Sequence, residues 1–336
     1  MRLLALSHIQ NLIQVVGCRD FFLQVIERIE VDYQHWERFE KTPRHATHVP
    51  GGVIELMPAS DDHYYAMKYV NGHPQNTSSG KPCVMAVGLL TRVSDGMPLL
   101  FSEMTILTAI RTACTSALVA KYCARPESKI LGCIGLGAQI EFQIVAFQCL
   151  FAITTVYLYD IDPGAVEKTV ANIQHLGLQI VVADSAQAVA KHADILTTAT
   201  AAKEHAILLH REDIKPGTHI NAIGGDCPGK TEWDIQEFVE DTIVVEYLPQ
   251  AKIEGEIQRL NDPDSVHSLH TVIEKGSTLR ENATEITFFD SVGFALEDYS
   301  ILRVVYALSQ THKIFASDDY IPTIENPKDL FSLLLE

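Results

Sequence analysis

Two different patterns of hydrophobic and polar positions meet near residue 125 of this chain. Before that point, apolar residues recur at helical spacing over about 20–40 and again over 103–124, which predicts two helices. Between them, turn residues separate short apolar runs, a pattern typical of antiparallel strands that bury one face of a sheet. The expected strands cover residues 52–57, 64–69 and 84–91.

After the Arg125-Pro126 break, apolar strands alternate with helices. The segments KILGCI, TTVYLYD, QIVVAD and DILTTAT predict successive strands, and their alternation with helices indicates a parallel sheet with crossover connections. A last helix, over about 293–310, is expected to pack back on the first part of the chain. The sequence therefore predicts an α/β protein with one domain over 126–292 and another over 1–125, to which residues 293–336 return.

Two glycines follow the first of these strands, where a helix opens. Gly135 permits a tight turn, and Gly137 lets the backbone come close to a pyrophosphate, which the helix N-terminus attracts. Ile140 stands in place of the third glycine of the fingerprint, so a plain strand–helix turn is the alternative. The next strand ends at Asp160, where a carboxylate would accept hydrogen bonds from the ribose of NAD and repel the 2′-phosphate of NADP. These features predict a Rossmann-type domain that binds NAD.

Several charged residues stand inside apolar segments, where a charge needs a partner. Arg111 interrupts the helix over 103–124, and it either forms a structural ion pair or binds an anionic ligand. Asp226 follows the apolar strand of NAIGGD, where it lies beside a nicotinamide or closes the strand with a turn. Lys68 and Glu55 lie in short strands, where each taken alone is expected to face outward. Arg44, taken alone, is expected to be a solvated loop charge.

Composition and charge narrow the class of protein. The 336 residues are 47% hydrophobic, which suits a folded core and argues against disorder. The formal net charge of −17 would repel nucleic acid, and no apolar run approaches the ~18 residues of a membrane span. The seven cysteines include no CxxC pair, which fits reduced thiols in the cytoplasm, and the histidine pairs lack the further ligands of a metal site.

Taken together, these segments resemble the ornithine cyclodeaminase/mu-crystallin family over nearly the whole chain. The most specific are NAIGGDCPGKTE and EMTILTAIRTACTSALVA, and the first is most similar to the ornithine cyclodeaminase branch. The other segments that carry the resemblance are KTPRHATH, GVIELMPA, YAMKYVNGHPQN, GLGAQIEFQ, YLYDIDP, PQAKIEGEIQRL and FFDSVGFALEDY.

The resemblance implies a homodimer in which the N-terminal domain, joined by the C-terminal helix, binds an amino acid and the Rossmann domain binds NAD. It assigns Arg44, Lys68 and Arg111 to the substrate carboxylate. It also assigns Glu55 to the substrate amines, Val292 to a further substrate contact and Asp226 to acid/base catalysis. The positions that match cofactor contacts are Cys83, Arg111, Gly135, Gly137, Ala138, Gln139, Asp160, Thr200, Ile223, Gly224, Gly225, Asp226, Lys230 and Ser291. Cys83 replaces an expected threonine, which would weaken one hydrogen bond.

The implied reaction converts L-ornithine to L-proline and ammonia, with NAD⁺ as a hydride acceptor that is regenerated in each turnover. Three cations suit one α-carboxylate, and two carboxylates suit two amines, so we expect the site to be far more positive than the whole molecule. An NAD(P)-dependent ketimine reductase or amino-acid dehydrogenase on the same scaffold is one alternative, and a lysine cyclodeaminase is another. A non-catalytic, crystallin-like binding protein is the third.

Overall fold

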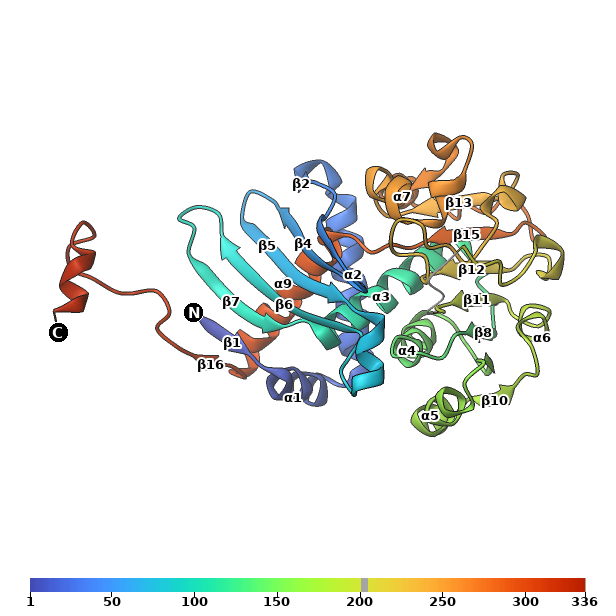
Figure 1. Ribbon diagram of the computed structural model, residues 1–336, viewed down its shortest axis with the longest axis horizontal. Helices are drawn as coiled ribbons and strands as arrows, with labels where there is room; N and C mark the ends of the chain where they lie inside the picture. Colours follow the sequence, from blue (N-terminus) through green and yellow to red (C-terminus); the bar gives the residue numbers. More distant parts are fainter. Residues whose placement is uncertain (201–204, 336) are drawn as a thin grey trace.

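Two eight-stranded sheets and the helices that pack on them make up most of the molecule (Figure 1). The structure is a computed structural model that describes residues 1–200 and 205–335. The first sheet has the order β16-β1-β7-β6-β5-β4-β2, with β3 paired to β4. Its strands are β1 (Arg2–Leu4), β2 (Glu40–Lys41), β3 (His45–Val49), β4 (Gly52–Ser60), β5 (Tyr64–Gly72), β6 (Val84–Arg92), β7 (Pro98–Glu103) and β16 (Ala316–Ser317).

Helices cover one face of the first sheet. They are α1 (Leu6–Val16), α2 (Cys18–Gln34), α3 (Thr105–Cys123) and α9 (Ala295–His312), and α9 packs on β4, β5 and β6. The approach of α9 is close, because a Cβ at Gly88 of β6 would lie within 3.1 Å of the Leu302 side chain. Helix α9 therefore packs on the N-terminal sheet, whereas the expectation that all of residues 293–336 return to it is wrong for residues 319–335, none of which is buried (Figure 1).

Side chains alternate strictly across the first sheet. Glu55, Met57, Lys68 and Val70 face the helices and are buried, whereas their neighbours on β4 to β7 point to the other face. That outer face exposes large apolar side chains, namely Leu56, Tyr65, Tyr69, Met85, Val87 and Phe101. The expectation that Lys68 and Glu55 point outward is wrong, because the strand register places both on the inner face.

The second sheet is entirely parallel, as predicted, and has the order β10-β9-β8-β11-β12-β15-β13-β14. Its strands are β8 (Ile130–Ile134), β9 (Thr155–Tyr159), β10 (Gln179–Val182), β11 (Ile195–Thr198), β12 (His219–Ala222), β13 (Thr242–Val245), β14 (His267–Ser268) and β15 (Thr287–Asp290). The helices that belong to it are α4 (Ile140–Leu150), α5 (Pro163–Ile173), α6 (Ala186–Ala190), α7 (Leu248–Glu254) and α8 (Leu269–Lys275).

The strand order reverses direction between β8 and β11, which is where open α/β sheets bind ligands at their carboxyl edge. Helix α3 lies between the two sheets, since it packs on β6 as well as on α4 and β12 (Figure 1). This arrangement brings the inner face of the first sheet toward the carboxyl edge of the second. None of the helices among the described residues is long and apolar enough to cross a membrane.

Candidate active site

The glycine turn after β8 is shaped to accept a group against its backbone. Gly135 has a φ of +84°, and a Cβ there would lie 2.5 Å from the Ala199 carbonyl oxygen, so only glycine fits. A Cβ at Gly137 would meet no atom within 4 Å, which leaves space above the turn. Ala138 and Gln139 then lead into α4, and the Gln139 Oε1 atom is buried without a hydrogen-bond partner. A bound phosphate group fits this open turn at a helix N-terminus.

The Asp160 carboxylate lies at the end of β9 and binds the same turn. Its Oδ2 accepts a hydrogen bond from the Leu136 amide at 2.6 Å, and its Oδ1 accepts one from the Asp162 amide at 2.8 Å. Asp162 itself caps α5, because its side chain accepts a bond from the Gly164 amide. Asp160 is therefore the acid that stands beside the turn, where a ribose would lie.

Two buried carboxylates pack against the turn that follows β12. A Cβ at Gly224 would lie 2.0 Å from Glu232 Oε1, and one at Gly225 would lie 2.5 Å from Glu256 Oε1. Glu232 also accepts a hydrogen bond from the Thr200 amide at 2.6 Å, which ties the end of β11 to this turn. The predicted residues Thr200, Ile223, Gly224 and Gly225 are thus brought together at one edge of the sheet.

Asp226 and Lys230 form the outer rim of this edge. Their side chains are 3.0 Å apart, and Asp226 is the more exposed of the two, with 55% of its side chain accessible. The charge of Asp226 raises the pKa of Lys230 against the opposing effect of burial. The Asp226 carboxylate is therefore accessible to a ligand that enters this edge of the sheet.

Seven buried charged side chains form a group of ion pairs that we call the ion cluster: Arg44, Glu55, Lys68, Arg111, Glu254, Glu297 and Asp298. Arg44 belongs to this cluster, so the expectation of a solvated loop charge is wrong. Its Nη1 donates to Glu55 at 3.1 Å, and its Nε lies 3.1 Å from Glu254 Oε2. Its Nη2 donates to the carbonyl oxygens of Val292 and Gly293 at 2.5 and 2.8 Å. The guanidinium is buried at 7% side-chain exposure, so these contacts replace its hydration.

Lys68 and Arg111 reach the cluster from β5 and α3 and share one carboxylate. The Lys68 ammonium lies 2.8 Å from Asp298, and the Arg111 Nε lies 3.0 Å from Asp298 Oδ1. Arg111 also donates to Glu297 at 2.6 Å. Burial and the nearby Arg111 charge lower the pKa of Lys68 to about 8. The carboxylates of Asp298 and Glu297 raise the pKa of Arg111, although burial opposes them.

The segment that joins β15 to α9 passes directly beneath Arg111. Gly293 has a φ of +74°, and a Cβ there would lie 2.4 Å from Arg111 Nη1. The buried carboxylate of Glu246 holds this segment, because it accepts bonds from the Ser291 hydroxyl and from the amides of Val292 and Gly293. Ser291 and Val292 are therefore placed between the sheet edge and the ion cluster.

Three of the carboxylates in the cluster were missed by sequence reasoning, namely Glu254, Glu297 and Asp298. Burial raises the pKa of Glu254 to about 7, and the neighbouring acids Glu55 and Asp226 add to the increase. The available signal was their position in PQAKIEGEIQRL and FFDSVGFALEDY, the segments that carry the family resemblance. With Glu55, four carboxylates stand against three cations, so the cluster is close to neutral. It is more positive than the molecule as a whole, but its acids offset the three cations.

Cys83 lies at the start of β6, where its carbonyl accepts a hydrogen bond from the His73 amide at 2.8 Å. Its thiol is partly buried. The role of Cys83 as a cofactor contact stays a prediction.

The fold and the site define a Rossmann-type α/β protein whose open carboxyl edge faces a buried cluster of ionised side chains. The family model of the ornithine cyclodeaminase/mu-crystallin family matches residues 7–312. A protein of Agrobacterium fabrum named ornithine cyclodeaminase is 46% identical over 332 residues, which cover 99% of this chain and 94% of that protein. The chain therefore belongs to the ornithine cyclodeaminase/mu-crystallin family.

Two solved structures share the whole architecture at 30% identity. One is Δ1-pyrroline-2-carboxylate reductase of Thermococcus litoralis in complex with NADH and L-proline, with a TM-score of 0.87 and coverage of 95% of this chain and 100% of that one. The other is an archaeal alanine dehydrogenase dimer with bound NAD, with a TM-score of 0.87 and coverage of 96% and 99%.

Proposed function

We propose that this protein is an ornithine cyclodeaminase, which converts L-ornithine to L-proline and ammonia. The observation that carries the proposal is the mixed charge of the buried cluster, where three cations meet four carboxylates. Ornithine carries one carboxylate and two ammonium groups, so a site for it needs both signs of charge within a few ångströms. The identity of 46% to a protein named ornithine cyclodeaminase supports this choice.

We assign the α-carboxylate of the substrate to Arg44, Lys68 and Arg111. A carboxylate that enters the cluster would replace Asp298 or Glu55 as a partner of these cations, and guanidinium groups offer it paired hydrogen bonds. Glu55 and Glu254 are then left to bind ammonium groups. Val292 closes the site on the side of α9, because its backbone is fixed by Arg44 and Glu246. Asp226, at the exposed rim, moves protons to and from the amines.

We propose that NAD occupies the carboxyl edge of the second sheet. Gly135, Gly137, Ala138 and Gln139 would hold its pyrophosphate, and Asp160 its adenosine ribose. Thr200, the turn over 223–226, Lys230 and Ser291 would surround the nicotinamide end, with Arg111 and Cys83 beside it. When bound, NAD⁺ would supply a reversible hydride acceptor for the substrate Cα, and the overall reaction would involve no net oxidation.

We also propose that the two domains bind different ligands. Residues 1–125 together with 293–336 bind substrate and form a homodimer, and residues 126–292 bind NAD. The apolar outer face of the first sheet supports the dimer, because patches of this kind on a folded protein mark interaction surfaces. One solved relative is a dimer. The thiol-rich composition supports a cytoplasmic location.

A product assay with substoichiometric NAD⁺ tests the proposed activity. Purified protein is incubated with L-ornithine at about 100 times the NAD⁺ concentration, and proline, ammonia and NADH are measured. We expect many moles of proline and ammonia per mole of NAD⁺ without accumulation of NADH. A reaction that stops after one equivalent of NADH would instead indicate a dehydrogenase. Parallel incubations with L-lysine, 2,4-diaminobutyrate and alanine identify the preferred side chain.

A net imine reductase is the second candidate, and the structural similarity to the Thermococcus litoralis reductase favours it over other chemistries. Such an enzyme would consume NADH with a cyclic imine and would leave ornithine unchanged. The presence of four carboxylates among three cations argues against it, since a cyclic imino acid has only one nitrogen to bind.

A further inference from the structure

The end of the chain leaves the body of the molecule. Strand β16 pairs with β1, and the Asp318 amide donates to the Met1 carbonyl at 3.3 Å. Figure 1 shows the following residues running away from both sheets to a short terminal helix, η8 (Leu330–Leu334). We name residues 318–335 the C-terminal arm. Within 319–335, every hydrogen bond of the structure joins residues of the arm itself, and no residue is buried.

The tip of the C-terminal arm is strongly apolar. Leu330, Phe331, Leu334 and Leu335 each expose between 61% and 78% of their surface. Helix η8 has only five residues, far fewer than the ~12–15 that an isolated helix needs in water. The arm therefore lacks both a core of its own and a helix stable by itself. Burial of its tip on another surface would stabilise it, since these large apolar side chains would then leave water.

The arm begins at the edge of the sheet whose outer face is apolar. Strand β16 flanks β1, β1 pairs with β7, and Phe101 of β7 is one of the exposed residues of the outer face. If two copies pair through this face, each arm begins at the edge of the interface, because β16 is the edge strand of the sheet. Its 18 residues span up to ~60 Å when extended, which is enough to cross a neighbouring subunit.

We propose that the C-terminal arm of each chain docks on a second copy of this chain, so that the two copies exchange arms reciprocally. This inference rests on the proposed homodimer and adds an element to it. A twofold interface places the same residues of each chain on both sides, so one apolar arm per chain yields two equivalent contacts. The arm would act as a clasp that slows dissociation of the dimer.

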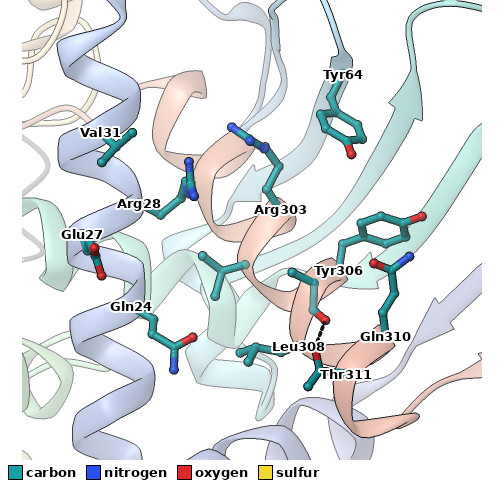
Figure 2. A pocket seen from close by; sticks show the side chains of 12 residues that line it. Gln24, Glu27, Arg28, Val31, Tyr64, Arg303, Tyr306, Leu308, Gln310 and Thr311 are labelled. Atoms are coloured by element: carbon teal, nitrogen blue, oxygen red, sulfur yellow. Dashed lines mark hydrogen bonds between the residues drawn. The ribbon is translucent and has the colours of Figure 1, made fainter.

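The competing destination is a groove on the same chain. It lies between α2 and α9, has a volume of about 450 Å³, and is lined by Arg28, Val31, Arg303 and Leu308 among others (Figure 2). The acidic residues of the arm could pair there with the two arginines. Both arginines, however, already face the buried carboxylate of Asp32, at 3.6 and 3.1 Å, and Glu27 also lines the groove. Two acids thus stand against the two arginines, so the groove offers the arm little unbalanced charge. We therefore favour the second copy.

A photo-cross-linking experiment on the full chain tests the destination of the arm. Benzoylphenylalanine is incorporated in place of Phe331, the protein is irradiated, and products are separated on a denaturing gel. We expect a covalent product with the mass of two chains. Its matched control carries the same probe together with Leu334→Asp and Leu335→Asp, and should lose that product. Cross-links confined to one chain, whether in the groove of Figure 2 or elsewhere, would overturn the proposal. The absence of any cross-linked product would overturn it as well.

Sedimentation velocity over a range of concentrations separates this inference from the proposed dimer. We expect a chain ending at Ser317, and the variant Leu330→Ser/Phe331→Ser/Leu334→Ser, to dissociate at least 10 times more readily than the intact chain. The control Asn326→Ser/Lys328→Ser changes only polar residues of the arm and should behave as the intact chain does. An intact chain that is monomeric throughout rejects both proposals. An intact dimer whose dissociation does not respond to loss of the arm rejects the clasp alone.

Discussion

Lys68 and Arg111 share the carboxylate of Asp298, and this sharing determines the charge that each cation offers to a substrate. Both side chains are buried, so their charges are shielded from water. The Arg111 guanidinium stays protonated at any working pH, since its pKa is raised further by two carboxylates. Lys68 differs, because burial and the Arg111 charge lower its pKa to about 8. Lys68 is therefore the cation of the site whose charge changes near neutral pH.

The affinity for a plain carboxylate should fall as the pH rises through about 8. The Lys68 ammonium loses its proton there, and with it one of three charges that hold the carboxylate. Pentanoate is a suitable probe, because it has no amine that titrates in this range. We expect its inhibition constant against ornithine to increase several-fold between pH 7 and 9. Lys68→Met should bind pentanoate weakly at both pH values and should retain only the smaller pH dependence that Glu254 contributes, since the pKa of Glu254 is raised to about 7. A pH dependence in this variant as large as that of the original chain would contradict the assignment.

Replacement of Asp226 by asparagine should abolish turnover and leave NAD binding intact. Asp226→Asn keeps the size of the side chain and its place beside Lys230 but cannot take up a proton. Loss of a general acid/base costs ~10²–10⁴-fold in rate, so kcat for ornithine should fall by at least ~100-fold. The dissociation constant of NAD⁺, followed by protein fluorescence, should change less than about threefold. A variant that keeps more than a tenth of the kcat would show that another group moves the protons.

Sequence reasoning identified the cations of the site and Glu55, but it missed the other three acids that hold these cations. Lys68 taken alone was expected to face solvent, because alternation in a short strand allows either face. Its burial follows from the register of β5 and from α9, which brings Asp298 to it from 230 residues away. Contacts over such distances depend on the packing of whole elements, and no local pattern predicts them. The family resemblance placed Lys68 in the site because it draws on the complete fold.

The glycine turn connects strand β8 to helix α4, and Asp160, at the end of strand β9, binds this turn. Its two carboxylate oxygens accept bonds from the Leu136 and Asp162 amides, so the acid shapes the turn as well as facing a ribose. The Asp160 carboxylate therefore has two roles: it holds the turn through hydrogen bonds, and its charge repels the 2′-phosphate of NADP. The two roles respond differently to substitution, which makes them separable.

Asp160→Asn removes the charge but keeps one acceptor oxygen for the turn, whereas Asp160→Ala removes both. We expect both variants to bind NADP⁺ at least about 10 times more tightly relative to NAD⁺ than the original chain does, because repulsion of the 2′-phosphate is gone. The alanine variant should in addition bind both cofactors more weakly, since the turn is less rigid. Titrations of intrinsic fluorescence with each cofactor measure these ratios. An unchanged preference in both variants would contradict the assignment of Asp160 to the ribose.

At the level of elements, the parallel sheet and the long helices were predictable, whereas some short strands of the first sheet were not. Helices α2 and α3 have many turns of apolar spacing, and the strands next to Gly135 and Asp160 are uniformly apolar. Strand β7, in contrast, was missed, although PLLFSE follows the turn at residue 96. It has six residues and runs directly into the predicted helix, so its apolar residues could not be told apart from the start of that helix. Pairing with β6 and β1 defines it instead.

The net charge of −17 describes the surface poorly, because several acids lie in the interior. Glu232, Glu246, Glu256 and Asp290 are fully buried behind the carboxyl edge of the second sheet. Asp290 accepts bonds from the Glu256 and Ile257 amides, and Glu256 accepts bonds from those of Glu232 and Trp233. Burial and the proximity of Asp290 raise the pKa of Glu256 to about 9, and burial raises that of Asp290 to about 7.

The stability of the ligand-free protein should therefore decrease as the pH rises from about 6.5 to 8.5. Carboxyl groups with raised pKa values keep protons in the folded state that the unfolded chain has released above pH ~4.5, so deprotonation favours unfolding. Lys68 opposes this trend only above about pH 8, and the buried His219, with its pKa lowered by burial to about 3, acts only below pH ~6.5. We expect Tm in calorimetry, at one protein concentration, to fall by about 5 °C over this range. Asp290→Asn should flatten the slope, whereas Asp184→Asn, at an exposed position, should leave it unchanged. A Tm that is constant or rises over this range would mean that these acids are ionised in the folded protein.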